Sequence, residues 1–324
     1  MRTVCAMAVF LCLSGVSLQP AVSQEACVPG PDKLGVSRTI SIDAARGPSF
    51  GGKYKSGELL KQGEVVLTFD DGPLRPTTRP ILEALAAHCT KATFFMLGRM
   101  ALADPALVKE VARHGHTVAS HTWSHGNLQA LSPEEGEAQI ELGLSAVQKA
   151  LGRPAAPFFR FPYLRDTPAS LDYVRGRHIA SFAIDVDSRD FEIRDADLVN
   201  ERVLKDLAAR GRGIILLHDI HASTAKAVPA LLAELKARGY RVVHLKARAG
   251  AETLADYDAA VREEVERRRL AAGGHPLTKR SITWPLTGLS PETIAKSKEG
   301  LSTAGPESLE PGAADDWTAN IWRQ

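Results

Sequence analysis

The sequence predicts an α/β protein built on a parallel sheet. Between residues 64 and 245, short apolar runs rich in β-branched and aromatic residues alternate with longer segments of helical period. This alternation indicates strands joined by helical crossovers, as in a (β/α) barrel or a doubly wound sheet. Polar residues fall at or just past the carboxyl ends of several of these strands. The barrel is favoured because such ends form its active-site face.

Seven strands are expected, at residues 64–69, 92–96, 116–120, 158–161, 179–185, 213–218 and 240–245. The polar residues at their carboxyl ends are Asp70, Asp71, His121, Arg160, Asp185 and His218. Seven runs of this kind, each followed by a crossover, suit a small barrel.

Helix boundaries are marked by local signals between the strands. Asp104 precedes Pro105 as a cap, and Ser132 with Glu135 three residues later forms a capping box. Helices are also expected at 195–210 and 224–238. Each is followed directly by a glycine, Gly211 and Gly239, where a helix commonly ends.

The segment before the barrel has two parts. Residues 1–23 have the layout of a secretory signal peptide, with Arg2 ahead of an apolar stretch and small residues before Gln24. The alternative is an uncleaved membrane anchor, because residues 3–24 carry no charge. Residues 24–61 follow as an irregular arm. We therefore expect an exported protein with no membrane span in the mature chain.

The segment after the barrel, residues 246–324, is expected to be a helix and a loosely ordered tail. The helix spans 251–269, and its run of arginines from Arg267 to Arg269 is typical of a solvated face. Beyond it Pro, Gly, Ser and Thr dominate, which favours low order.

Two cysteines, Cys27 and Cys89, remain outside the predicted signal peptide. Their spacing matches no metal motif. In an oxidising compartment they would either form a disulfide that fixes the arm or stay as two buried thiols.

The charge balance limits the classes of partner. The chain has 40 Lys+Arg against 38 Asp+Glu, a formal net charge of +2. Such a balance gives no strong positive electrostatic potential to attract polyanions, so nucleic acid is not an expected partner.

Two motifs predict metal chemistry. His121 and His125 are four residues apart, which would place both imidazoles on one side of a helical turn, within reach of one metal ion. Asp70 and Asp71 leave an apolar strand together, and adjacent residues of an extended segment point in opposite directions. One carboxylate could complete a site of two histidines and one acid, and the other could act as a base. The alternative is that one aspartate only caps a turn before Gly72.

Five motifs in order resemble the polysaccharide deacetylase family, also known as carbohydrate esterase family 4 or the NodB homology domain. They are Thr-Phe-Asp-Asp-Gly at 68–72, His-Thr-Trp-Ser-His at 121–125, Arg-Phe-Pro-Tyr at 160–163, the segment 185–191 and Leu-Leu-His at 216–218. The resemblance covers residues 62–245 and implies a distorted (β/α)7 barrel that removes acetyl groups from sugars with a bound metal.

The resemblance also implies a role for individual residues. Asp71, His121 and His125 match the metal ligands of the family, Asp70 its general base and His218 its general acid. The backbone N–H of Tyr163 would stabilise the oxyanion, while Arg160 and Asp190 would orient the base and the acid. Phe191 stands where the family commonly has tryptophan, so an aromatic wall remains without the indole donor. Leu217 is expected to line the pocket for the acetyl methyl group, with plain strand core as the alternative.

The function expected from these residues is deacetylation of an N-acetylglucosamine-type glycan by an exported enzyme. Two histidines and one aspartate suit Zn²⁺, and they also accept Co²⁺, Ni²⁺ or Mn²⁺. An O-acetyl xylan esterase or a cyclic-amide hydrolase could use the same site. From another class, the alternative is a catalytically silent glycan-binding protein of the cell envelope.

Overall fold

The computed structural model describes residues 27, 30, 32–54 and 59–273 of the 324-residue chain. The predicted signal peptide and the predicted tail beyond residue 273 lie outside the described residues. In the described part, no helix is both long enough and apolar enough to cross a bilayer.

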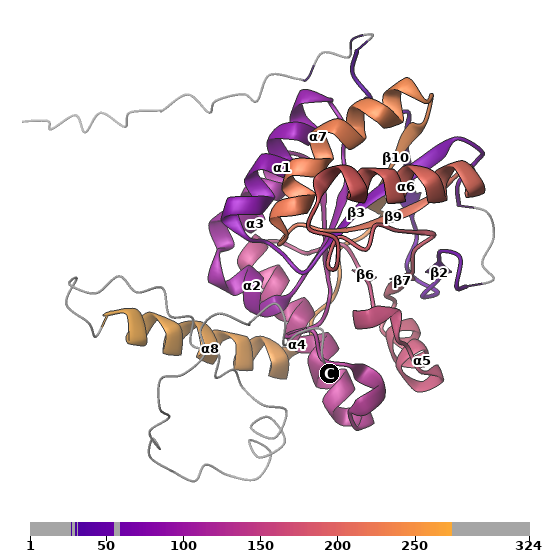
Figure 1. Ribbon diagram of the computed structural model, residues 1–324. Coiled ribbons are helices and arrows are strands. Elements are labelled where there is room, and N and C mark those ends of the chain that lie inside the picture. Colours follow the sequence, from indigo (N-terminus) through magenta and orange to yellow (C-terminus); the bar gives the residue numbers. More distant parts are fainter. Residues whose placement is uncertain (1–26, 28–29, 31, 55–58, 274–324) are drawn as a thin grey trace, which may run out of the picture.

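The centre of the molecule is one parallel sheet that curves into an incomplete barrel (Figure 1). Its strands run in the order β1-β10-β3-β4-β5-β6-β7-β2, and β9 pairs with both β3 and β8. The strands are β1 (Arg38–Ile42), β2 (Ser49–Phe50), β3 (Glu64–Asp70), β4 (Thr93–Met96), β5 (Thr117–Ser120), β6 (Phe158–Phe159), β7 (Ala180–Phe182), β8 (Val186–Asp187), β9 (Gly213–His218) and β10 (Arg241–Ala247). Within the described residues β7 and β8 are not paired, so the barrel is open there. The predicted α/β class and distorted barrel are confirmed.

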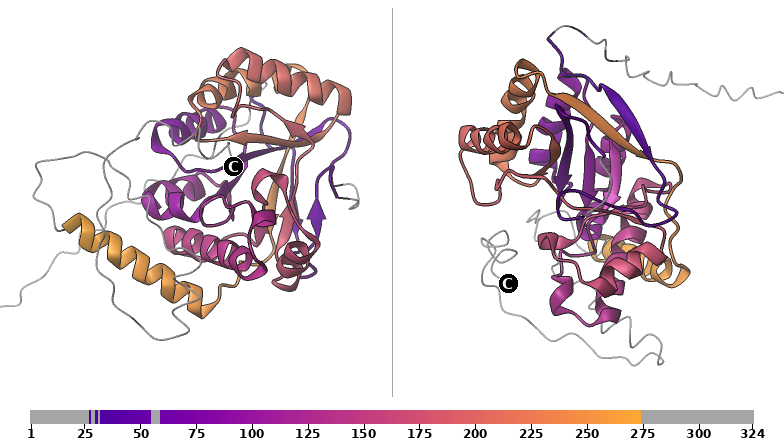
Figure 2. Two further views of the ribbon diagram at one scale, coloured as in Figure 1. Left: turned by 60° about the horizontal axis from the view of Figure 1, so that its bottom comes forward. Right: turned by 90° about the vertical axis from the view of Figure 1, so that its right-hand side faces the viewer.

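Helices pack against the outer face of this sheet (Figure 2). They are α1 (Arg75–Ala87), α2 (Gly98–Ala103), α3 (Pro105–Arg113), α4 (Pro133–Leu151), α5 (Pro168–Gly176), α6 (Ala196–Arg210), α7 (Ala222–Ala237) and α8 (Ala255–Gly273), with short 3-10 turns η1 (Leu128–Ala130) and η2 (Pro162–Leu164).

The predicted helix signals are confirmed. The Ser132 hydroxyl accepts from the Glu135 N–H at 3.2 Å, and the Glu135 carboxylate accepts from the Ser132 N–H at 2.9 Å. Asp104 caps α3 by accepting from the Leu107 N–H at 3.1 Å. Gly211 ends α6 in the left-handed conformation, at φ 74°.

Two apolar cores lie on the two sides of the sheet. The larger one packs the helices against the outer face of the strands. The smaller one fills the barrel interior, where the rings of Phe158 and Phe95 lie 4.9 and 5.8 Å from that of Phe182. This interior packing leaves the carboxyl end of the barrel for polar groups.

The arm is more regular than predicted. It contributes β1, which pairs with β10, and β2, which pairs with β7. Neither strand shows sustained apolar alternation, because each covers an edge of the sheet rather than its centre. The Arg38 guanidinium also ties β1 to Glu64 of β3, at 2.8 Å to its Oε1.

The single strand predicted at 179–185 is divided in the structure. After β7, the Ala183 N–H donates to the Phe50 carbonyl of β2, whereas the Asp185 N–H donates to the Ile214 carbonyl of β9. The chain therefore crosses the opening of the barrel before β8 begins. Apolar character alone did not reveal this change of partner.

A disulfide joins Cys27 of the arm to Cys89, just after α1, with Cα atoms 5.4 Å apart. This confirms the disulfide hypothesis and excludes two buried thiols.

Candidate metal and catalytic site

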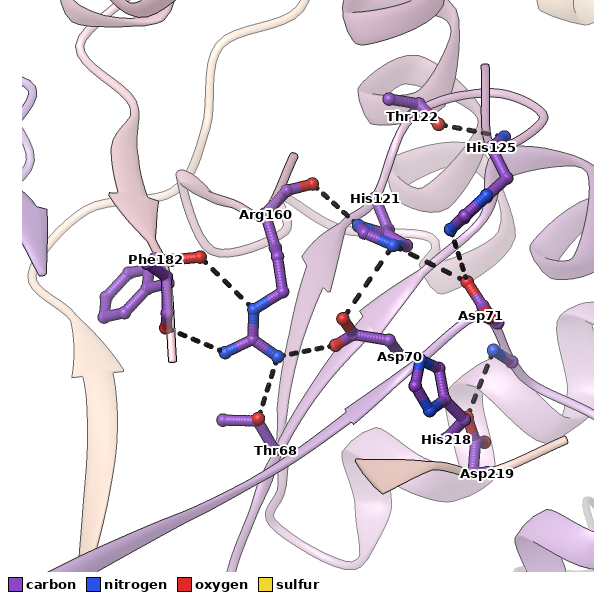
Figure 3. A network of polar contacts seen from close by, with 12 residues as sticks. Thr68, Asp70, Asp71, His121, Thr122, His125, Arg160, Phe182, His218 and Asp219 are labelled. Carbon is purple, nitrogen blue, oxygen red and sulfur yellow. Dashed lines mark hydrogen bonds and ion pairs between the residues drawn. The ribbon is translucent and has the colours of Figure 1, made fainter. Parts of the chain in front are cut away.

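The predicted site residues converge at the carboxyl end of the barrel. Asp70 ends β3 and His218 ends β9, and the two are register partners in adjacent parallel strands. His121 directly follows β5, two strands away from β3 on its other side. The parallel sheet thus gathers residues far apart in the sequence at one edge (Figure 3).

The segment from His121 to His125 is an irregular loop and not the predicted helical turn. Thr122 and His125 have positive φ angles of 75° and 65°. The Thr122 hydroxyl accepts from the His125 N–H at 3.0 Å and so stabilises the turn. Both imidazoles nevertheless reach one carboxylate, because each Nε2 lies 3.5 Å from Oδ1 of Asp71. The convergence was predicted correctly and its local geometry was not.

Neighbouring helices fix this loop closely. The Thr122 carbonyl accepts from the Gly98 N–H at 2.9 Å, and the Trp123 N–H donates to the Gln139 carbonyl at 2.8 Å. Gly143 of α4 lies directly beneath: a Cβ there would be 2.4 Å from the Thr122 carbonyl carbon. Only glycine lets α4 approach the loop this closely.

Asp71, His121 and His125 form a cluster that could hold a metal ion. One ligand atom from each lies within 4.8 Å of the others, and all three side chains are buried. Neither carboxylate oxygen of Asp71 has a hydrogen-bond partner among the described residues. The Arg160 carbonyl lies 2.7 Å from Nδ1 of His121 and can only accept, so Nδ1 carries the proton and Nε2 keeps its lone pair.

Electrostatics favour the ligand forms of these residues. Burial lowers the pKa of His121 to about 3, so the imidazole is neutral at physiological pH. Burial alone would raise the pKa of Asp71, but the nearby imidazoles of His125, His218 and His121 outweigh it and lower the pKa. Two neutral imidazoles and a carboxylate fit a divalent cation, and three protein ligands leave positions for water and substrate.

Asp70 lies beside this cluster and is held by Arg160. The guanidinium Nη1 donates to Oδ1 of Asp70 at 2.7 Å and to the Thr68 hydroxyl at 2.8 Å, while Nε donates to the Phe182 carbonyl at 3.2 Å. Arg160 is wholly buried and also stacks on Phe95. Burial raises the pKa of Asp70 to about 6 although Arg160 opposes the shift. The group can therefore both take and release a proton near neutrality.

His218 is paired with Asp190. Its Nδ1 lies 2.6 Å from Oδ1 of Asp190, whose Oδ2 accepts from the His218 N–H at 2.7 Å. Burial disfavours the imidazolium, but the Asp190 carboxylate outweighs burial and raises the pKa of His218 to about 10. A protonated His218 therefore faces the cluster across a wide pH range.

The remaining predicted residues border these groups. Tyr163 has a positive φ of 56°, and its ring meets that of His125 edge-on, with centroids 4.6 Å apart. The Phe191 ring lies 5.9 Å from that of His218. The prediction for Leu217 needs correction. Its side chain is buried in the core between sheet and helices, on the face of β9 opposite to His218, which leaves Leu216 on the same face as His218.

Two residues near the site escaped the sequence analysis. Asp219 accepts from the Gly72 N–H at 3.1 Å and from the Thr78 hydroxyl at 2.5 Å, and burial raises its pKa to about 7. Its position directly after His218 was the available signal. Lys53 of the arm donates to the Leu164 carbonyl at 2.8 Å, next to Tyr163, and no motif marked it.

Comparisons with known proteins identify relatives of this chain. The family model described as "Polysaccharide deacetylase" matches residues 58–177. A peptidoglycan-N-acetylglucosamine deacetylase of Listeria monocytogenes is 36% identical over 182 residues, which cover 55% of this chain and only 37% of that relative's length. A chitooligosaccharide deacetylase of Azorhizobium caulinodans is 36% identical over 159 residues, 49% of this chain and 74% of that protein.

A solved structure shares the fold of this chain. The chain resembles a peptidoglycan deacetylase of Bdellovibrio bacteriovorus with a TM-score of 0.60 and 33% identity, covering 71% of this chain and 62% of the other. Shared sequence over most of one relative, together with a shared fold, decides the classification. The chain belongs to the polysaccharide deacetylase family.

Proposed function

We propose that this protein is an exported hydrolase that removes acetyl groups from N-acetylglucosamine-type glycans. The observation that carries the proposal is the placement of Asp70 and His218 on adjacent strands beside the Asp71, His121 and His125 cluster. A protein that only bound glycan would need neither a base nor an acid. The names of the two sequence relatives, both deacetylases of glucosamine-containing glycans, support this substrate class.

The proposed metal is Zn²⁺, held by Asp71, His121 and His125. When bound, such a cation would polarise the acetyl carbonyl and acidify water. Co²⁺, Ni²⁺ and Mn²⁺ suit the same donors.

The chain's own residues then have distinct tasks. Asp70, ionised above a pKa of about 6, takes a proton from the attacking water while Arg160 holds its carboxylate in place. The Tyr163 N–H donates to the oxyanion as it develops on the acetyl group. His218, kept protonated by Asp190, gives its proton to the nitrogen that leaves. An amine is a poor leaving group until it is protonated, so this last transfer completes the reaction.

Export is supported by the disulfide between Cys27 and Cys89, because such bonds persist in oxidising compartments. Together with the signal-like residues 1–23, the disulfide suggests that the enzyme meets its glycan outside the cytoplasm.

Acetate release tests the proposal. The purified protein, loaded with Zn²⁺, is incubated with chitooligosaccharides, peptidoglycan and acetylated xylan, and Asp70→Asn is assayed beside it. We expect acetate from the N-acetylated substrates and a loss of at least about 100-fold in kcat for the variant, since general base catalysis contributes this much. Acetate from xylan alone would replace the proposal by an esterase, and full activity of Asp70→Asn would show that the base is another residue.

A further inference from the structure

We propose that the C-terminal helix α8 supports the metal site, with Arg268 acting as a positioning residue through Trp123. This inference rests on the proposed function, because it assigns a metal to the loop that contains Trp123. It gives a role to a helix beyond the residues that the family model matches.

Trp123 lies between the two histidines in sequence and is fixed on several sides. Its carbonyl accepts from the Arg99 N–H at 3.0 Å, and its N–H donates to α4. A Cβ on Gly98 would be 2.9 Å from Cε3 of its ring, so α2 touches the indole closely. The residue as a whole is only 2% exposed. Any change in its packing would shift the backbone that connects His121 to His125.

Helix α8 contributes the guanidinium that lies over this ring. The Cζ of Arg268 is 6.0 Å from the ring centroid, within the range of a cation–π contact. Among the three consecutive arginines only Arg268 turns inward, with 25% of its side chain exposed against 49% for Arg267 and 76% for Arg269. The prediction of a solvated face therefore fails at this one position.

Glu264 sets the position of Arg268. Its Oε1 accepts from Nε of Arg268 at 2.6 Å, and its other oxygen pairs with Arg267. The Glu264 side chain is 2% exposed on a helix whose other charges are largely solvated. Because burying a carboxylate is costly unless it is paired, the pair with Arg268 fixes the geometry of both groups.

The helix itself is firmly attached. Val261 is buried in the larger core, with Tyr257, Ala260 and Val265 packed against it. Figure 1 shows α8 running beside α4, the helix that carries Gln139 and Gly143. The loop at residues 121–125 is thus held between α2 and α4. Arg268 of α8 covers Trp123 within this loop.

The support matters because the loop is conformationally strained. Thr122 and His125 both have positive φ angles, a conformation that costs of order 1 kcal/mol or more for a residue with a side chain and persists only where its surroundings enforce it. Loss of the Arg268 contact lets the loop relax, and the two imidazoles lose their preset spacing. Changes behind metal ligands commonly weaken affinity by 10- to 100-fold.

The test is the Kd for Zn²⁺ of the full-length protein, measured by competition with a chelator in the absence of glycan. We expect Arg268→Gln to weaken binding about tenfold, with Arg268→Lys intermediate because lysine keeps the charge but not the planar group. Arg269→Gln is the matched control and should bind as the wild type does. Hydrogen exchange of the segment 121–125 should be faster in Arg268→Gln than in this control.

The outcomes separate the two proposals. An Arg268→Gln variant with the same Kd for Zn²⁺ as Arg269→Gln overturns the inference, whatever the exchange data show. Failure of the wild type to release acetate from any glycan, with the Kd difference intact, overturns only the proposed function. A wild-type chain that binds none of Zn²⁺, Co²⁺, Ni²⁺ and Mn²⁺ removes both. The double variant Trp123→Phe/Arg268→Gln should lose little more affinity than Trp123→Phe, and full additivity would contradict a route through Trp123.

Discussion

At the scale of single residues, buried charged side chains influence the protonation of their neighbours. Asp190 and Arg160 have opposite charges and comparable positions, each wholly buried behind the group that it orients. One keeps His218 protonated, and the other keeps Asp70 within reach of ionisation at neutral pH. The two pKa values, about 10 for His218 and about 6 for Asp70, match the proposed roles of an acid and a base.

Removal of the Asp190 charge should move the alkaline limit of activity. Because His218 has a pKa raised to about 10, the wild type should stay active until the pH approaches that value. In Asp190→Asn the largest influence that opposes burial is lost, and only the weaker effects of Asp71 and Asp70 still raise the pKa of His218. The alkaline limb of kcat/KM should therefore move from about pH 10 toward the ordinary histidine value of about 6.5, and the rate at pH 8 should fall about tenfold. A pH profile of acetate release checks this, with exposed Glu192→Gln as control. An unmoved alkaline limb would contradict the assignment of His218 as the acid.

The same shift has a consequence for stability. The folded pKa of His218 lies above its unfolded value of about 6.5. The raised pKa of His218 therefore contributes its full stabilisation of the fold below about pH 6.5. This contribution is lost as the pH rises from about 6.5 through about 10.

The site residues were largely predictable because their types and order are informative. The two histidines of 121–125, the paired aspartates at 70–71 and His218 lie at or soon after the carboxyl ends of strands, where a barrel has its active-site face. The prediction that Leu217 lines the pocket was wrong because successive side chains of a strand point to opposite faces, so Leu217 cannot share the face of His218. Asp219 was missed because a single acid carries no spacing signal until its partners, Gly72 and Thr78, are known.

At the scale of elements, α4 approaches the loop at residues 121–125 so closely that Gly143 has no room for a side chain. Gly143→Ala would place a methyl group 2.4 Å from the Thr122 carbonyl carbon. We expect a loss of about 1–3 kcal/mol of unfolding free energy and weaker Zn²⁺ binding. Gly136→Ala, on the same helix, would meet only Leu128 Cδ2 at 3.9 Å, and should be neutral or stabilising by up to about 1 kcal/mol. Thermal unfolding and Zn²⁺ titration compare the two, and equal effects would exclude steric control by α4.

Elements with strong local signals were predicted well, and those defined by distant partners were not. Ser132 and Asp104 start helices by local hydrogen bonds that the sequence displays directly. The strands β1 and β2 exist only because β10 and β7 offer free edges. Likewise, the loop at 121–125 departs from a helical turn because Gly98 and Gln139, remote in sequence, bind its backbone.

At the scale of the whole molecule, the disulfide closes a long segment of chain. Cys27 and Cys89 are 62 positions apart, and a cross-link of this length contributes about 2–4 kcal/mol by restricting the unfolded chain. The double variant Cys27→Ser/Cys89→Ser should therefore lose about 2–4 kcal/mol of unfolding free energy and unfold at a lower urea concentration. Its affinity for Zn²⁺ should change little. Urea titrations of the two proteins, each with and without reductant, check this. A wild type that is indifferent to reductant would contradict the prediction.

The pairing of β1 with β10 affects how the chain can complete its fold. Arg38 lies opposite Val243, so the first described strand finds its partner 205 positions later, and in the described residues it pairs with no other strand. Contacts between such distant positions slow folding. During synthesis β1 thus waits until nearly the whole domain has been made. The pairing of β1 with β10, the last strand among the described residues, therefore closes this edge of the sheet late in folding.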